Sequence, residues 1–86
     1  MEIQDLKLDG NAIGGLMLEL FGADMTDAGS VCGNCGAHEE MARLDVYTGA
    51  GIVVRCRHCE SVMVRIVQGH ERTWIDLSGT ASLQLG

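Results

Sequence analysis

Proline is absent from this chain of 86 residues, and aromatic side chains are scarce, with one Trp, one Tyr and one Phe. A chain of this length forms one domain and buries only about 60 to 65% of the surface that its unfolded state exposes. With so few large side chains, a hydrophobic core alone leaves such a domain marginally stable. We therefore expect a single domain that contains an additional stabilising element.

Basic residues are also few, since 6 Lys and Arg face 12 Asp and Glu, which gives a formal net charge of -6. Affinity for phosphates needs a surplus of positive charge, so this balance argues against a protein that binds nucleic acid chiefly by electrostatics. A positively charged protein partner is more consistent with the charge. At 47% apolar residues, the chain is nevertheless too hydrophobic to be disordered.

Long apolar runs and catalytic motifs are missing as well. No run approaches the roughly 18 residues that cross a bilayer, and the first residues, Met1 to Asp5, lack the basic start of an export signal. We expect no membrane segment and a cytoplasmic protein. No Gly-x-Gly-x-x-Gly motif, P-loop or nucleophile elbow occurs, and no enzymatic activity is expected. Glu39 and Glu40 beside His38 are expected to lie in an exposed turn.

The four cysteines form two Cys-x-x-Cys pairs with 20 residues between them, Cys32-Gly33-Asn34-Cys35 and Cys56-Arg57-His58-Cys59. This spacing is typical of zinc sites, because each short turn directs two thiolates at one tetrahedral Zn²⁺, about 2.3 Å from each sulfur. We expect one zinc ion, bound by Cys32, Cys35, Cys56 and Cys59. Four protein ligands leave no open position for a substrate, so the site is predicted to be structural and no catalytic residue is expected.

Three other uses of the cysteines fit the spacing less well. Two disulfides require an oxidising compartment, for which no export signal is seen. A thioredoxin-type redox pair requires one Cys-x-x-Cys at the start of a helix in a βαβ unit. Iron in a four-cysteine site, as in rubredoxin-like electron carriers, stays open, although such carriers usually have a more aromatic core than Phe21, Tyr47 and Trp74 provide.

The residues beside the cysteines differ between the two pairs. Gly36 follows the first pair, where such a turn favours a residue that tolerates positive φ. Glu60 occupies the same place after the second pair, so its geometry is less clearly specified. His38, His58 and His70 are not needed as ligands, because four thiolates already complete the tetrahedron.

The first 30 residues carry six acids against one lysine, a net charge of -5, and are expected to form a helical segment. Apolar residues recur there at the spacing of one helix face, namely Ile13, Leu16, Met17, Leu20 and Phe21. Asp9 or Asn11 can cap the start of a helix of about three turns, and Gly22 can take the left-handed position at its end. We expect the apolar face to pack on the sheet that follows, with Ala23 to Ser30 as a connector.

The cysteine-bearing part, residues 31–78, carries five arginines against six acids, and its apolar period changes from 3.6 to 2. This alternation predicts four strands, at residues 42–47, 52–55, 61–67 and 72–77. The tail, residues 79–86, can form an edge strand or a loose end. The predicted fold is a small α+β protein: an N-terminal amphipathic helix in residues 1–30 precedes a zinc ribbon of antiparallel β hairpins with two Cys-x-x-Cys knuckles.

Short matching segments run through most of the chain and carry a family resemblance. They are Leu8-Asp9-Gly10-Asn11-Ala12 with Gly14-Gly15-Leu16 and Glu19-Leu20-Phe21, then Cys32-Gly33-Asn34-Cys35-Gly36, Leu44-Asp45-Val46-Tyr47, Val54-Arg55-Cys56-Arg57-His58-Cys59 and Arg72-Thr73-Trp74-Ile75-Asp76-Leu77. In these segments the chain resembles small zinc-ribbon proteins and, more closely, an uncharacterised bacterial family of short chains. The resemblance implies the ribbon fold and the four cysteines as zinc ligands, but it implies no activity.

Polar and aromatic residues on the predicted strands leave two kinds of partner open. Those expected opposite the apolar face are Arg43, Asp45, Tyr47, Arg55, Arg65, Arg72, Trp74 and Asp76. If Arg and Asp pair across strands and arginine stems cover Trp74, this face is simply solvated, and we predict an adaptor that binds another protein. The alternative is a transcription or translation factor that binds nucleic acid through Arg55, Arg57, Arg65, Arg72 and Trp74. A rubredoxin-like iron carrier is a second alternative.

Overall fold

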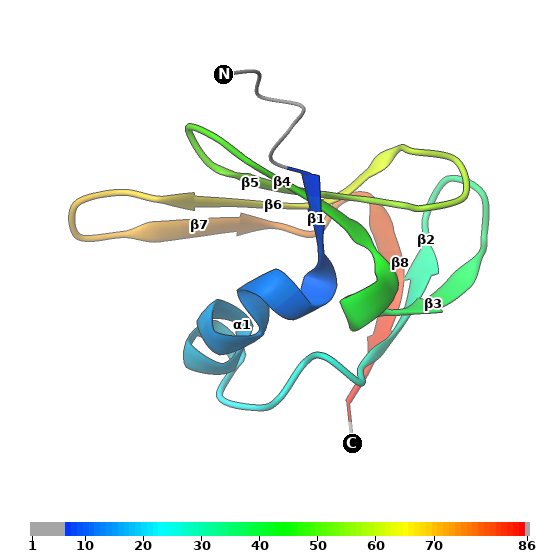
Figure 1. The fold of residues 1–86 in the computed structure, drawn as a ribbon, viewed down its shortest axis with the longest axis horizontal. Coiled ribbons are helices and arrows are strands. Elements are labelled where there is room, and N and C mark those ends of the chain that lie inside the picture. Colours follow the sequence, from blue (N-terminus) through cyan, green and yellow to red (C-terminus); the bar gives the residue numbers. More distant parts are fainter. Residues whose placement is uncertain (1–6, 86) are drawn as a thin grey trace.

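One short helix and two antiparallel sheets make up the fold, which a computed structural model describes for residues 7–85 (Figure 1). The larger sheet has the strand order β1-β4-β5-β6-β7, with β1 (Lys7–Asp9), β4 (Asp45–Thr48), β5 (Ile52–Arg55), β6 (Val62–Gln68) and β7 (Thr73–Asp76). The smaller sheet has the order β3-β2-β8, with β2 (Gly29–Cys32), β3 (His38–Glu40) and β8 (Thr80–Gln84). This small α+β architecture agrees with the class that the sequence predicts.

The hydrophobic core covers one face of the larger sheet, where the predicted alternation of side chains is found. Val46, Val54 and Val64 lie side by side on β4, β5 and β6, and all three are fully buried. The helix α1 (Gly14–Phe21) lies along one side of this sheet (Figure 1), and its Met17 belongs to the same core. The helix therefore packs on the sheet, as its apolar stripe predicts.

The predicted three-turn helix divides into two parts. A 3-10 turn, η2 (Gly10–Ile13), precedes α1, and Asp9 caps it by accepting a hydrogen bond from the Asn11 amide at 3.1 Å. Gly22 follows α1 at φ 71°, the left-handed conformation expected at this position. The caps are thus where the sequence places them, while the first turn is tighter than an α-helix.

A second 3-10 turn, η3 (Met41–Arg43), replaces the start of the strand predicted from residue 42, and β4 begins only at Asp45. This turn buries the Met41 side chain in the core. It also packs against Gly10, where an added Cβ would lie 1.8 Å from the Met41 carbonyl oxygen. The close contact between η2 and η3 explains why the chain tightens at both places.

The predicted connector, residues 23–30, contributes to the core rather than merely joining elements. Met25 and Ala28 are buried, and the last two residues of the connector already belong to β2. The tail forms β8, which pairs with β2 and packs Leu83 against the core. Side chains from all three predicted segments, 1–30, 31–78 and 79–86, therefore meet in one core. Between residues 7 and 85, no helix combines the length and the apolar character needed to cross a membrane.

Candidate metal centre

The four cysteines lie in or directly before two loops, one from each sheet. Cys32 ends β2 and Cys35 lies in the loop that leads to β3, while Cys56 and Cys59 lie in the loop between β5 and β6. Their sulfur atoms all lie within 4.8 Å of one another. All four are free thiols, of which Cys32 and Cys56 are buried, Cys59 is half-buried and Cys35 is exposed. Folding thus brings together the whole set of ligands that the sequence predicts.

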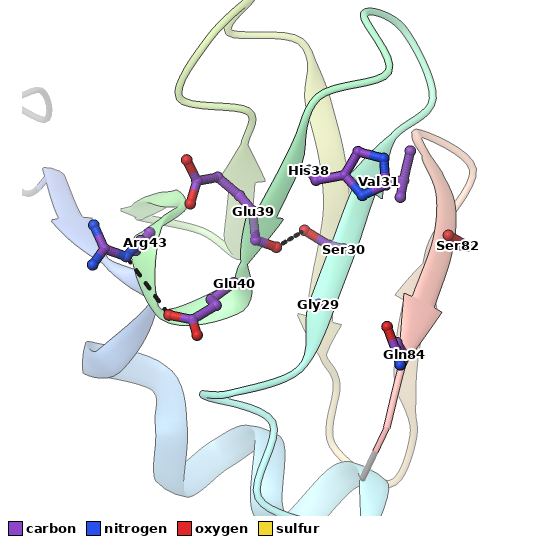
Figure 2. Close-up of a pocket in the computed structure, with 9 residues that line it drawn as sticks. All are labelled: Gly29, Ser30, Val31, His38, Glu39, Glu40, Arg43, Ser82 and Gln84. Carbon is purple, nitrogen blue, oxygen red and sulfur yellow. Dashed lines mark hydrogen bonds and ion pairs between the residues drawn. The ribbon is translucent and has the colours of Figure 1, made fainter.

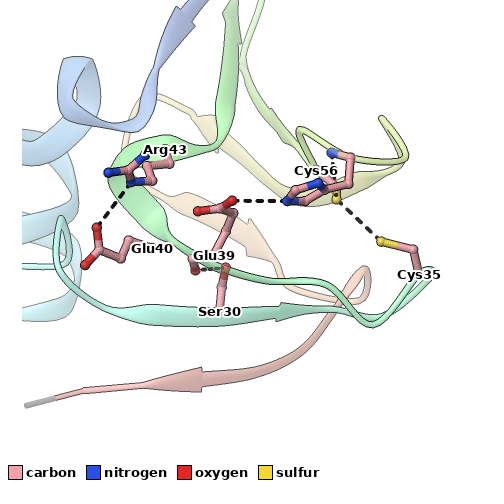
Figure 3. Close-up of polar contacts among 7 residues, drawn as sticks. Ser30, Cys35, Glu39, Glu40, Arg43 and Cys56 are labelled. Atoms are coloured by element: carbon pink, nitrogen blue, oxygen red, sulfur yellow. Dashed lines mark hydrogen bonds and ion pairs between the residues drawn. The ribbon is translucent and has the colours of Figure 1, made fainter.

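The distances between the sulfurs are compatible with a tetrahedral metal ion. Cys32 Sγ lies 3.7 Å from Cys59 Sγ. Cys35 Sγ lies 3.7 Å from Cys56 Sγ, the pair that Figure 3 draws. Four sulfurs at about 2.3 Å from a central ion have tetrahedron edges of about 3.8 Å. Zinc and iron both accept four thiolates in this arrangement. The cluster could therefore bind one metal ion.

Each Cys-x-x-Cys turn directs a backbone amide at its first sulfur. The Asn34 amide donates to Cys32 Sγ at 3.3 Å, and the His58 amide donates to Cys56 Sγ at 3.3 Å. Such donors offset part of the negative charge that thiolates carry when they bind a metal ion. The two turns are therefore equivalent at this position, although their sequences differ.

The residue after each pair closes its turn. The Gly36 amide donates to the Cys32 carbonyl at 3.0 Å, and the Glu60 amide donates to the Cys56 carbonyl at 2.9 Å. Both residues have positive φ, 77° for Gly36 and 66° for Glu60. Glu60 is the one residue other than glycine with positive φ in the described part of the chain, at a steric cost of about 1 to 2 kcal/mol. Arg55 Nη1 supports the second turn by donating to the Glu60 carbonyl at 2.8 Å.

Side-chain donors gather at one sulfur of the cluster, that of Cys59. Asn34 Nδ2 lies 3.4 Å from Cys59 Sγ, and Ser61 Oγ lies 3.1 Å from it. These two hydrogen bonds stabilise the thiolate and lower the pKa of Cys59 to about 5. Ser61 Oγ also lies 3.5 Å from Cys32 Sγ, and this contact lowers the pKa of Cys32. The cysteine spacing alone predicts no role for Asn34 or Ser61, although both lie within two residues of a cysteine.

The exposed cysteine, Cys35, shows the opposite behaviour. The Ala37 amide lowers the pKa of its thiol, but desolvation and the three neighbouring sulfurs outweigh that amide and raise the pKa to about 11. At neutral pH, the metal-free cluster therefore combines a thiolate at Cys59 with a protonated thiol at Cys35. A metal ion that binds all four sulfurs has to displace the Cys35 proton.

The histidines do not belong to the sulfur cluster, which consists of the four cysteines alone within residues 7–85. His58 Nε2 lies 3.1 Å from Glu39 Oε2, so this side chain connects the second cysteine loop to β3. His38 is exposed on β3, and His70 is exposed in the turn between β6 and β7. The prediction that no histidine is required as a ligand is consistent with this placement.

Residues 38–40, predicted to lie in an exposed turn, form the edge strand β3. The Glu39 carbonyl accepts a hydrogen bond from the buried Ser30 hydroxyl at 2.7 Å, and the Glu40 carboxylate lies 3.6 Å from Arg43 Nε (Figure 3). These residues line a shallow hollow of about 560 Å³ on the smaller sheet (Figure 2). No buried side-chain polar atom within residues 7–85 lacks a hydrogen-bond partner, so no unpaired buried group points into this hollow.

The arginines expected on one face of the larger sheet are only partly brought together. The strand register places Arg55 opposite Asp45 and Arg65 opposite Asp76, as expected for pairing across strands. Arg43 instead lies in η3, because that turn replaces the start of the predicted strand. Two further arginines lie in loops, Arg57 in the second cysteine loop and Arg72 just before β7.

The aromatic residues of this face differ in their surroundings. The guanidinium of Arg55 lies over the Tyr47 ring, 5.8 Å from its centroid. Trp74, by contrast, is 56% exposed, so the predicted cover by arginine stems is wrong for this residue. The exposed indole remains the largest apolar feature on the outer face of the sheet.

The chain belongs to a family described as "Family of unknown function (DUF6510)", which matches it over residues 3–86. It has no significant match among curated proteins or among solved structures. The family covers nearly the whole chain, including the four cysteines, but its description contains no activity. A function for this chain therefore has to be inferred from the chemistry of the cysteine cluster.

Proposed function

We propose that the chain is a zinc-ribbon protein in which Cys32, Cys35, Cys56 and Cys59 hold one structural Zn²⁺. The observation that carries this proposal is the convergence of four free thiols within 4.8 Å, with edges close to those of a tetrahedral zinc site. The matched Cys-x-x-Cys turns, each between two antiparallel strands, support the ribbon. When bound, the ion supplies a cross-link between two loops that belong to different sheets.

A structural role follows from the number of ligands. Four protein thiolates complete the tetrahedral shell and leave no position for a substrate or an activated water. The small core also favours this role, since a domain of this length with few large side chains gains much of its stability from a metal. We therefore propose that the protein is not an enzyme and that the ion holds the smaller sheet against the larger one.

The metal-stabilised domain is proposed to bind another protein in the cytoplasm. The net charge of -6 favours a basic partner. Four free thiols are suited to a reducing compartment. Exposed apolar side chains such as Leu18 are of the kind that protein partners cover.

The zinc proposal is tested by elemental analysis of the protein purified from its native host. We expect one zinc ion per chain. Stoichiometric iron with a thiolate-to-iron charge-transfer band would instead support a rubredoxin-like carrier. A folded protein that contains neither metal would contradict the proposal altogether.

The partner proposal is tested by a pull-down with the metal-loaded protein as bait. We expect a basic protein in stoichiometric amount, and we expect a Cys35→Ser bait, which cannot complete the metal site, to lose it. A partner that the Cys35→Ser bait retains equally well would show that binding does not need the folded domain. This outcome would contradict an adaptor role.

A second candidate function is nucleic-acid binding, which the arginine and aromatic side chains on the outer face of the larger sheet favour. Arg55 stacks over Tyr47, Arg65 lies on the neighbouring strand, and Trp74 is exposed for stacking on a base. Binding of an oligonucleotide across a salt series separates this function from the adaptor. Tight binding at physiological salt, with a steep negative slope of log affinity against log salt, would favour nucleic acid.

A further inference from the structure

The edge strand β7 leaves polar backbone and a large apolar side chain exposed together. It ends the larger sheet in the described part of the chain, with β6 on one side only. Trp74 on β7 is 56% exposed, and its neighbour across the strands, Val67, is 46% exposed. Free edges of this kind readily pair with another strand unless proline, a bulge or charge prevents it. Figure 1 shows the β6–β7 hairpin extending away from the smaller sheet, and Thr73, Trp74 and Asp76 of β7 are exposed.

The hydrogen-bond pattern identifies which residues of β7 are available for pairing. The Gly69 amide donates to the Arg72 carbonyl at 2.7 Å and closes the β6–β7 turn. In an antiparallel ladder, alternate residues direct their backbone groups to the same side. Arg72, Trp74 and Asp76 therefore direct their amides and carbonyls toward β6. Thr73 and Ile75 direct theirs toward the free edge.

The side chains of β7 form a pattern that is complementary to itself. Arg72, Trp74 and Asp76 alternate along the chain, so they share the outer face, with opposite charges at equal distances from the indole. When two such strands run antiparallel with their Trp74 residues opposite each other, each Arg72 faces an Asp76. A parallel arrangement would place like charges opposite each other, which is unfavourable.

We propose that the protein forms a symmetric dimer in which β7 pairs antiparallel with β7 of a second copy, with the two Trp74 side chains opposite each other. Thr73 of one copy then exchanges backbone hydrogen bonds with Ile75 of the other, on the side that the β6–β7 ladder leaves free. The two larger sheets become one continuous sheet. Asp76, which faces Arg65 within its own chain, lies between Arg65 and Arg72 of the second copy.

Charge also favours a second copy as the occupant of this edge. Residues 61–78 carry two arginines and two acids, so this end of an otherwise acidic chain is neutral. Two copies can approach through it with little local repulsion, although each carries a net charge of -6. The contact is small, since it involves one short strand and one indole from each copy. We therefore expect weak association, in the micromolar range.

The test uses two charge variants of the full chain, Arg72→Asp and Asp76→Arg, in sedimentation and native mass spectrometry. Wild type should dimerise as its concentration rises from about 1 to about 500 µM, the range of weak interfaces. Each variant alone places like charges opposite each other and should associate at least about tenfold more weakly. An equimolar mixture restores Arg opposite Asp at both positions and should form a heterodimer, which the two masses identify.

A third variant, Thr73→Pro, tests the backbone pairing. The Thr73 amide points away from β6, so proline should remove the contact with the second copy and leave the β6–β7 ladder intact. We expect a monomer with an unchanged metal content. The single Trp in the chain supplies an independent signal, because burial of the indole shifts its fluorescence to shorter wavelength as wild type, but not Thr73→Pro, is concentrated.

Several results would overturn the dimer. A wild type that stays monomeric at about 500 µM would do so, as would a dimer that both charge variants retain or a mixture that forms no heterodimer. An extended peptide from another protein that binds this edge while wild type stays monomeric would assign the edge to a different occupant and reject ours. Zinc content is measured on the same samples, so failure of the dimer is distinguishable from failure of the metal proposal.

Discussion

The two Cys-x-x-Cys turns reach the same geometry with different sequences. Each directs an amide at its first sulfur at 3.3 Å and closes through an amide of the residue after its second cysteine. The first turn uses Gly36 for the positive φ, whereas the second forces Glu60 into that conformation. Both turns therefore adopt the same backbone shape, and either glycine or glutamate can occupy its positive-φ position.

The turns also differ in the hydrogen bonds that fix them to the surrounding structure. The first is fixed to the tail, because the Gly33 amide donates to the Gly79 carbonyl at 2.9 Å. The second is held by Arg55 and by the Ser61 hydroxyl beside Cys59. The turns belong to different sheets, and the sulfur cluster connects them. A metal ion in the cluster would therefore fix the position of the smaller sheet relative to the larger one.

The largest expected effect comes from removing one ligand from either turn. Cys35→Ser and Cys56→Ser should both leave the domain largely unfolded, because about 10 to 16 kcal/mol of metal binding is coupled to folding in small zinc modules. Circular dichroism with and without a chelator measures this, and the chelator should unfold wild type to the same extent.

Burial makes this pair of variants informative. Cys56 is buried and Cys35 is exposed, so packing alone would make Cys56→Ser much more damaging than Cys35→Ser. Equal damage supports a shared metal. A Cys35→Ser variant with a cooperative melt at the wild-type temperature would show that the cluster does not hold a structural ion.

The next effect concerns the donors that the two turns share. Asn34 belongs to the first turn, but its side chain donates to Cys59 in the second. Asn34→Ala should raise the pKa of Cys59 from about 5 toward its ordinary value, so that protons compete with the metal at higher pH. We expect about tenfold weaker metal binding and a metal-release midpoint at higher pH, measured by competition with a chromogenic chelator.

A matched control exists for this variant. Asn11→Ala makes the same change at an exposed residue whose amide, not its side chain, is hydrogen-bonded, and it should leave metal release unchanged. If both variants release the metal at the pH of wild type, the Asn34 side chain has no part in stabilising the thiolate.

The third effect concerns the positive-φ residue that follows each cysteine pair, Gly36 in the first turn and Glu60 in the second. Gly36→Ala should destabilise the protein by about 1 kcal/mol, because it adds a Cβ at φ 77°. Glu60→Gly should have the opposite sign and stabilise it by up to about 1 kcal/mol, reduced by the extra freedom of glycine in the unfolded chain. Chemical denaturation of the metal-loaded variants measures both. If both substitutions lower the free energy of unfolding, the positive φ of Glu60 does not strain the second turn.

The sequence predicts the elements that have a strong period, and the cysteine spacing predicts the cluster. The alternation around Val46, Val54 and Val64 and the cap at Gly22 are found where expected. The sequence does not predict β2 and β3, because neither strand shows an apolar alternation. The buried positions of β2 are Ser30 and Cys32 rather than Val31, and β3 contains no apolar residue.

Tertiary contacts account for the remaining differences. Met41 turns into the core at the place where the predicted strand would begin, and Gly10 packs against it. No local pattern contains such a contact between residues 31 positions apart in the chain. Likewise, the contact of the Asn34 side chain with Cys59 joins residues 25 positions apart, so only folding creates it.

The smallest expected effect comes from the side-chain pair His58–Glu39, which joins the second turn to β3. His58 Nε2 and Glu39 Oε2 are 3.1 Å apart, with side chains that are 48% and 19% exposed. Because partly exposed pairs contribute little, Glu39→Gln should lower stability by less than about 1 kcal/mol, and high salt should reduce the difference. Glu40→Gln is the matched control, since the Glu40 carboxylate pairs with Arg43 in the neighbouring 3-10 turn and not with the second cysteine turn. If Glu39→Gln weakens metal retention and Glu40→Gln does not, the His58–Glu39 pair helps to align the two cysteine turns. If both variants retain the metal equally well, the sulfurs and the backbone alone align the turns.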